Sequence, residues 1–195
     1  MKRTKTNFFN TRNLVLMAVL ISMQIVLARF LAIQASDFLR ISFEAVPVAL
    51  AGMWLGPLAG AIVAWVSDFL GMCLFGQGTY FPLIALGPVA YAIICGVGTK
   101  YVFRSNLAEH GETWKAIVLL VIGGIINAFV IGPVTTTLYS IMVMGNTAAF
   151  DVLLWTNLVS RFATKPITIA IDTILVTAVN RTVYKPVIRK IVARA

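Results

Sequence analysis

The chain has 195 residues, of which 59% are hydrophobic and 12% are charged, and its formal net charge is +9. Soluble domains average about 25% charged and about 45–50% apolar residues, so this composition excludes a water-soluble enzyme and a disordered or collagen-like chain. A helix needs about 20 apolar residues to cross a bilayer. We therefore expect one transmembrane domain over residues 1–195, an all-α bundle of six helices with short connections.

Apolar runs divide the chain into six predicted membrane spans. The second span is short and ends at Gly56-Pro57, a tight-turn signal. The loop between the first and second spans, expected over residues 34–43, carries Asp37 and Arg40. The spans are expected over residues 13–33, 44–55, 58–75, 81–103, 114–144 and 151–180.

Most of the cations lie on one side of this topology. Twelve of the 16 Lys and Arg residues precede the first span, flank the connection between the fourth and fifth spans, or follow the sixth. Cytoplasmic loops carry an excess of Lys and Arg, so we expect both termini in the cytoplasm. Nucleic-acid binding needs cations clustered on one face, and their spread over three segments argues against it.

Three cations, Arg29, Arg161 and Lys165, fall inside predicted spans. Each costs about 2.5–3.5 kcal/mol at a helix centre on insertion scales. Such residues normally face the interior of a bundle and mark a pathway or a ligand site.

Polar residues of the sixth span follow helical spacing. Steps of four, four, three and four place them on one face of a helix that is otherwise mainly aliphatic, so this face is expected to point inward. The residues are Asn157, Arg161, Lys165, Thr168 and Asp172. Two cations one turn apart suit a carboxylate or phosphate ligand. The alternative is internal ion pairing, in which Asp172 or Asp68 neutralises them.

Asp68 lies in the middle of the third span, between Trp65 and Phe69. A carboxylate accepts two parallel N–H donors, so Asp68 suits a ligand with a guanidine-like N–H pair. The alternative is a salt bridge to Arg161 or Lys165.

The segment that follows the third span combines glycines, aromatic residues and one amide. Glycine permits unusual backbone angles and aromatic rings supply stacking area, as a lid over a planar ligand requires. An ordinary hairpin with aromatic residues at the membrane interface is the alternative. The candidate ligand contacts are Phe75, Gln77, Tyr80 and Phe81.

Ala18 and Ser22 form a small-xxx-small pair in the first span, which lets another helix approach closely. Arg29 lies eleven residues after Ala18 and therefore on nearly the same face. It reaches a ligand only if the helix bends or ends near it.

Motifs for nucleotide or hydrolytic chemistry are missing from the sequence. It contains no G-x-x-x-x-G-K-[ST], H-E-x-x-H or G-x-S-x-G. His110 is the single histidine, and no cluster of metal-ligand residues is visible. We therefore expect neither an enzyme nor a cofactor in this chain. A lipid-phosphate enzyme, with Arg161 and Lys165 on the headgroup, and a scaffold subunit are the alternatives from other classes.

The chain resembles the substrate-binding S components of energy-coupling factor (ECF) transporters, and within them the folate-specific family. The resemblance covers most of the chain. It rests on Ile41-Ser42-Phe43, Pro47-Val48-Ala49-Leu50-Ala51-Gly52-Met53, Gly56-Pro57, Gly60, Asp68, Gly78-Thr79-Tyr80-Phe81-Pro82, Arg161, Lys165 and Pro166.

The resemblance implies a vitamin-binding subunit in a prokaryotic plasma membrane. Such a subunit captures its vitamin outside, docks on a membrane coupling subunit carried by two cytoplasmic ATPases that use ATP, and releases the vitamin inward. The family's Ala-x-x-x-Ala contact with the coupling subunit corresponds to Ala18 and Ser22 here. Riboflavin, pantothenate or a related vitamin is the alternative ligand.

Folate also fits the inventory of residues in the spans. Its glutamate carries two carboxylates, which Arg29, Arg161 and Lys165 would neutralise. Its planar pterin would stack on aromatic side chains and present an N–H pair to Asp68. Our hypothesis places the pterin inward and the glutamate toward the loops.

Overall fold

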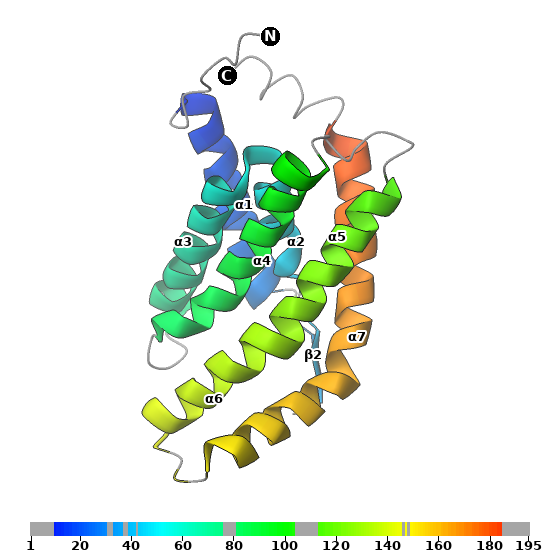
Figure 1. The fold of residues 1–195 in the computed structure, drawn as a ribbon. Coiled ribbons are helices and arrows are strands. Elements are labelled where there is room, and N and C mark those ends of the chain that lie inside the picture. The colour runs from blue at the N-terminus through cyan, green and yellow to red at the C-terminus, as the bar shows by residue number, and fades with distance from the viewer. Residues whose placement is uncertain are drawn as a thin grey trace.

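The computed structural model of the chain describes residues 10–30, 33–36, 39–41, 43–75, 81–103, 113–145, 147 and 149–184. Nearly all of this part of the chain is helical (Figure 1). The elements are α1 (Thr11–Arg29), β1 (Ile33–Ser36), β2 (Leu39–Ile41), α2 (Ala45–Leu55), α3 (Pro57–Phe75), η1 (Pro82–Ala85), α4 (Leu86–Val97), η2 (Gly98–Val102), α5 (Thr113–Ile126), η3 (Asn127–Ile131), α6 (Gly132–Met142) and α7 (Phe150–Val183).

Five helical segments are long and apolar enough to cross a membrane: α1, α3, the run from η1 to η2, the run from α5 to α6, and the second part of α7. The helical, membrane-type fold expected from composition is therefore confirmed. Helix α2 is also apolar but has only 11 residues.

The connection between α1 and α2 differs from the predicted loop. Helix α1 ends at Arg29, four residues before the expected end of the first span at residue 33. Strands β1 and β2 then pair antiparallel, with Ile33 opposite Ile41 and Gln34 opposite Arg40. This pairing supplies partners for backbone N–H and C=O groups that an open loop would leave to solvent.

Helix α2 is buried on nearly all sides. Every residue from 46 to 54 is buried, and the helix packs against α1, α3, α4 and α7. A helix that is apolar all round belongs in the interior of a bundle. Gly52 and Gly60 make this possible, because a Cβ on Gly52 would meet the Ala92 carbonyl and a Cβ on Gly60 would lie 2.8 Å from the Gly52 Cα.

Buried hydrogen bonds join helices that are distant in sequence. The Trp54 indole N–H donates to Asn180 Oδ1 at 2.8 Å, which ties α2 to the end of α7. The Ser67 hydroxyl donates to Gln24 Oε1 at 2.5 Å, which ties α3 to α1. Helices α1 to α3 are therefore held by close backbone packing and by satisfied polar pairs, one of which reaches α7.

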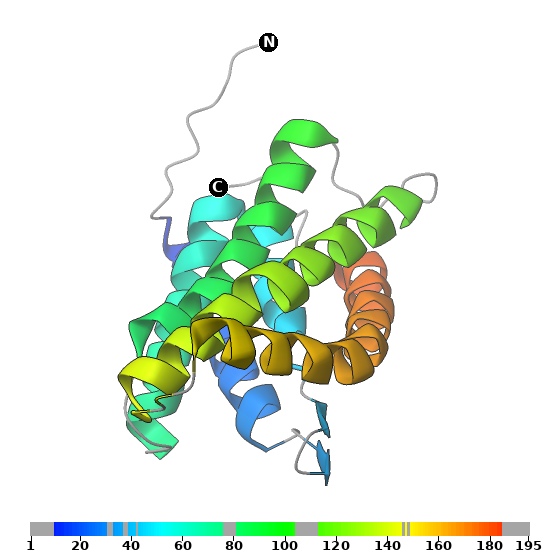
Figure 2. The ribbon, with the colours of Figure 1, turned by 60° about the horizontal axis from the view of Figure 1, so that its bottom comes forward.

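Helix α7 runs for 34 residues and contains Pro166. Its first and second parts, yellow and orange in the ribbon, meet at an angle (Figures 1 and 2). Proline lacks the N–H of the helical ladder and clashes with the preceding turn, which kinks a helix. Helix α7 contacts η3, α6, α5 and α2. Figure 1 shows its first part running beside α6 and its second part beside α5.

We predict that Gly52→Ala destabilises the protein. The added methyl would overlap the Ala92 carbonyl, and overpacking of a tight interior costs about 1–3 kcal/mol. The expected result is a fall of several degrees in the melting temperature of the detergent-solubilised protein.

Gly71→Ala is the matched control, because its nearest neighbour, the Arg29 guanidinium, would lie 3.5 Å from the new Cβ, an ordinary contact. Equal melting temperatures for the two variants would show that the crossing of α2 and α4 is looser than described.

Candidate binding pocket

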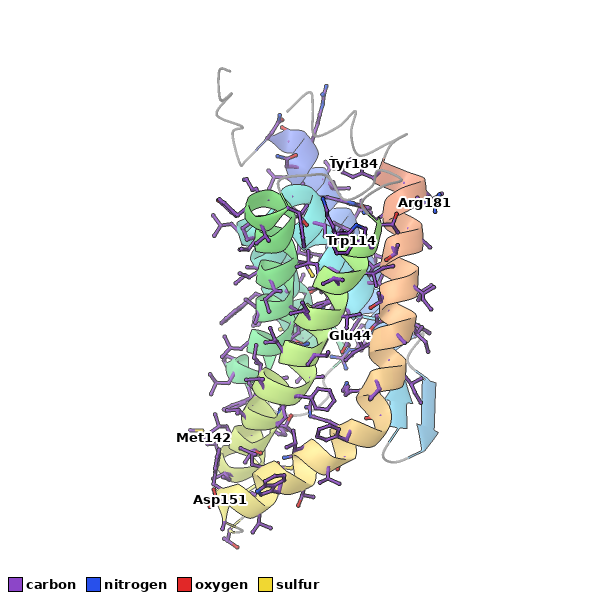
Figure 3. The ribbon with its side chains drawn as sticks, turned by 45° about the vertical axis from the view of Figure 1, so that its right-hand side comes forward. Glu44, Trp114, Met142, Asp151, Arg181 and Tyr184 are labelled. Atoms are coloured by element: carbon purple, nitrogen blue, oxygen red, sulfur yellow. The ribbon has the colours of Figure 1, made fainter. Side chains whose placement is uncertain are left out.

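A pocket lies between the start of α2, helix α4, the α5–η3 region and the face of α7 that carries the polar stripe. It encloses about 560 Å³ of space free of protein atoms, part of it open to solvent. Glu44, which lines the pocket, lies roughly midway between Asp151 at one end of the bundle and Arg181 at the other (Figure 3). The lining residues are Glu44, Ala45, Tyr91, Gly124, Asn127, Ala128, Arg161, Lys165, Thr168, Ile169 and Asp172.

The structure brings four of the five stripe residues of α7 to this pocket: Arg161, Lys165, Thr168 and Asp172. They share the wall because their spacing repeats the helical period across the bend. Asn157, the fifth, donates instead to the Thr137 hydroxyl of α6 at 3.1 Å and does not line the pocket.

Arg161 is anchored by a local break in the facing helix. At η3 the Gly132 N–H bonds back to Asn127 O, five residues earlier, and Pro133 has no N–H. The Ala128 carbonyl therefore has no donor in its own helix. Arg161 Nη1 approaches that oxygen at 3.5 Å.

The same guanidinium makes two further contacts on α6. Arg161 Nη2 donates to the Thr136 hydroxyl at 2.8 Å and to Gly132 O at 3.3 Å. A Cβ on Gly132 would collide with Nη1, so glycine is what admits the guanidinium. These bonds use three of the five N–H groups of an arginine, and the charge remains at the pocket wall.

The pocket carries acids as well as cations. Asp172 is 7% exposed, and within the part of the chain that the structure describes its Oδ1 is buried without a hydrogen-bond partner. It interacts electrostatically with Glu44 and with Lys165. Lys165 and Asp172 are electrostatic neighbours, so the pocket has mixed charge, and internal ion pairing stays an alternative prediction.

Arg29 at the end of α1, Asp68 inside α3 and Phe75 at the end of α3 form a second group, and none of them lines the pocket. The Arg29 guanidinium carbon lies 5.9 Å from the centre of the Phe75 ring, and its Nη2 lies 3.6 Å from the Met72 sulfur. Asp68 has Arg29 and Glu44 as electrostatic neighbours, not Arg161 or Lys165. Because α1 ends at Arg29, this side chain can turn toward α3.

The predicted lid is described only at its edges. Phe75 packs edge-on against Phe30 with ring centres 5.7 Å apart, and Phe81 lies at the same distance from Tyr139 of α6. Gln77 and Tyr80 lie outside the described residues. Their assignment to a lid stays a prediction.

Ala18 and Ser22 lie on the outer face of α1. Both are exposed, whereas Met17, Leu20 and Gln24 on the opposite face are buried. The Ser22 hydroxyl donates to Val19 O of its own helix at 2.9 Å. This face is thus available to a partner, and its contact with one stays a prediction.

Sequence reasoning did not name five of the polar lining residues as ligand contacts: Glu44, Tyr91, Asn127, Thr168 and Asp172. Two signals were present. Asp172 belongs to the polar stripe, where it was considered only as an ion-pair partner. Asn127 is an amide in the long apolar run of the fifth predicted span. Glu44 and Tyr91 carry no comparable pattern, because α2 and α4 are brought to the pocket by tertiary packing.

Comparisons with known proteins relate the chain to one family of membrane transporters. The model of the family described as "ECF transporter, substrate-specific component" matches residues 12–180. A folate transporter FolT of Clostridium novyi (strain NT) is 45% identical over 84 residues, 43% of this chain and 48% of the relative. A second FolT, from Leuconostoc mesenteroides subsp. mesenteroides, is 32% identical over 72 residues, 37% of this chain and 38% of the relative. The chain thus aligns with about half or less of the length of these relatives.

Among solved structures, the crystal structure of FolT bound with folic acid superposes with a TM-score of 0.67 at 28% sequence identity. The superposition covers 89% of this chain and 95% of that one. The structural similarity therefore extends over most of the chain.

We predict that Arg161→Met lowers the stability of the ligand-free protein. The Ala128 carbonyl would lose its charged donor, and a buried acceptor left without its partner costs about 1–3 kcal/mol. Gly132 O would keep the hydroxyl donors of Thr135 and Thr136. Thermal unfolding in detergent without added ligand is expected to shift down by several degrees.

Ser160→Ala on the preceding residue serves as the control, because its hydroxyl donates only to Thr156 O of the same helix. If the two variants melt together, the guanidinium does not hold α7 to the η3 region.

Proposed function

Because the chain belongs to the family of substrate-specific components of ECF transporters, we propose that it is the folate-binding subunit of such an importer. It captures folate from outside the cell and passes it inward after docking on a coupling module driven by ATPases. The substrate follows from the similarity to proteins named as folate transporters and to a FolT bound with folic acid.

The observation that carries the proposal is the mixed charge of the pocket. Small-molecule pockets combine apolar walls with a few placed polar groups, and this one sets Ala45, Ala128 and Ile169 beside the charged and polar side chains of α7. Arg161 and Lys165 supply positive charge for the glutamate carboxylates of folate, and Tyr91 offers a ring beside a planar ligand. A scaffold protein would have no use for charged groups at such a site.

The proposed topology has six spans with both termini in the cytoplasm of a prokaryotic cell. Five helices meet the length and hydropathy of a span, and α2, enclosed by its neighbours, provides the sixth. The cation distribution of the sequence supports this orientation.

Calorimetry of the purified protein in detergent against a panel of vitamins tests the function. One-to-one binding of folate alone is the expected result. Binding of riboflavin or pantothenate in its place would keep the transporter class and replace the ligand. No binding of any vitamin by a protein with a cooperative melting transition would overturn the proposal, and a lipid-phosphate assay would follow.

We predict that Lys165→Ala weakens folate binding at least about tenfold, since a lost charged hydrogen bond costs about 1.5–3 kcal/mol. Titration calorimetry against folate measures the change. Lys100→Ala makes the same chemical change at an exposed position on η2, away from the pocket. A Kd for Lys165→Ala equal to that of Lys100→Ala would remove Lys165 from the ligand site.

The proposed partners are a membrane coupling subunit and two cytoplasmic ATPases, with ATP used by those subunits. The outer face of α1 supports this docking. Ala18 and Ser22 are exposed beside the apolar Val15 and Val19, and small residues let a second helix approach closely.

We predict that Ala18→Trp abolishes folate uptake by cells that co-express the coupling module but leaves folate binding by the purified subunit unchanged. The bulky ring would hold the partner helix away. Ile174→Trp, on an exposed position of α7, is the control for added bulk. Loss of binding along with uptake would instead assign Ala18 to the fold.

A further inference from the structure

We propose that Asp172 determines ligand specificity at the inner end of the pocket, by accepting hydrogen bonds from the N–H donors of an aminopyrimidinone ring. For folate this ring is the pyrimidinone part of the pterin, with its 2-amino group and N3–H. The inference rests on the proposed function and deepens it, because it fixes which end of the ligand meets which residue.

The first argument is the state of the Asp172 carboxyl group. The side chain is 7% exposed and lines the pocket, and Oδ1 has no hydrogen-bond partner among the described residues. A buried acceptor without a partner is a rare and costly feature of folded proteins. A ligand with N–H donors supplies the missing partner when it binds, so its binding free energy depends on those donors.

The second argument is the electrostatic surrounding of this group. Lys165, about two helical turns before Asp172 on α7, attracts the carboxylate, while Glu44 at the start of α2 repels it. An anionic group of the ligand at this position would face both Asp172 and Glu44, whereas a neutral pair of N–H donors adds no charge. The inner end of the pocket therefore favours a neutral donor edge, and the end near Arg161 favours an anion.

The third argument is the arrangement along α7. Asp172 and Arg161 are eleven residues apart, at most about 16 Å along a helix that rises about 1.5 Å per residue. Folate carries its donor edge and its two carboxylates at opposite ends of an extended molecule. A pterin on Asp172 thus directs the glutamate toward Arg161 and Lys165, and Tyr91 and Ile169 flank the space near the ring.

Asp172 replaces Asp68 as the acceptor in this scheme. Asp68 does not line the pocket and has Arg29 as an electrostatic neighbour at the end of α1. Asp172 combines a place on the pocket wall with an unused buried oxygen.

A double-mutant cycle between protein and ligand tests the contact. Wild type and Asp172→Asn are each titrated calorimetrically with folate and with 2-desaminofolate, which lacks the 2-amino group. We expect the wild type to bind 2-desaminofolate at least about tenfold more weakly than folate, as for loss of a charge-assisted hydrogen bond. In Asp172→Asn the difference between the two ligands should shrink to less than about threefold.

Each outcome decides the inference. If the wild type binds both ligands equally, or if the two losses are additive, Asp172 does not contact the 2-amino group. If Asp172→Asn fails to fold, the wild type titrated with both ligands still tests whether an acceptor contacts the 2-amino group. Glu44→Gln titrated with both ligands then separates the two acids. An unchanged ratio of the two Kd values assigns the contact to Asp172, whereas a ratio near one assigns it to Glu44 and overturns the inference.

Asp151→Asn makes the same chemical change at an exposed position of the same helix and is expected to preserve the wild-type ligand difference. Failure of the proposed function has a different signature, because the wild type would then bind neither folate nor 2-desaminofolate.

Discussion

The carbonyl that η3 leaves without an internal donor is the point on which the pocket depends. A backbone acceptor inside a helical bundle must find a partner, and Arg161 reaches across from α7 to Ala128 O while its second amino group bonds Gly132 O and Thr136. The break in the helix at η3 therefore provides a backbone acceptor to which α7 binds through Arg161. The Asn157 amide, which donates to the Thr137 hydroxyl, and the contact of the Phe162 ring with Phe129 add to this attachment of the first part of α7.

The two halves of the fold are held by different means. The helices from α1 to α4 pack through glycine and alanine, with backbones in near contact around Gly52 and Gly96. The helices from α5 to α7 supply most of the polar side chains of the pocket wall, which α2 and α4 complete, and α7 carries a proline bend. A tightly packed half beside a polar half is a suitable design for a binding subunit, because the first keeps its shape while the second presents groups that a ligand can complete.

Much of this arrangement could be predicted from sequence, for identifiable reasons. Hydropathy located the long helices, and the 3.6-residue period placed Arg161, Lys165, Thr168 and Asp172 on one face. The hairpin after α1 was missed because short strands have little pattern of their own, and the membership of Glu44 in the pocket depends on how α2 is buried. The contact of Arg29 with Phe75 could not be predicted either, since no pattern in the local sequence indicates that α1 ends at Arg29.

The length of α2 has a consequence for how the chain enters the bilayer. Eleven residues rise only about 16 Å, roughly half of a hydrocarbon core about 30 Å thick. Such a segment is too short to partition as an independent span during synthesis. The turn at Gly56, with its positive φ of 96°, folds it directly onto α3. We therefore expect α2 to enter the bilayer together with α3 as a helical hairpin, and the helices packed around α2 to fix its depth.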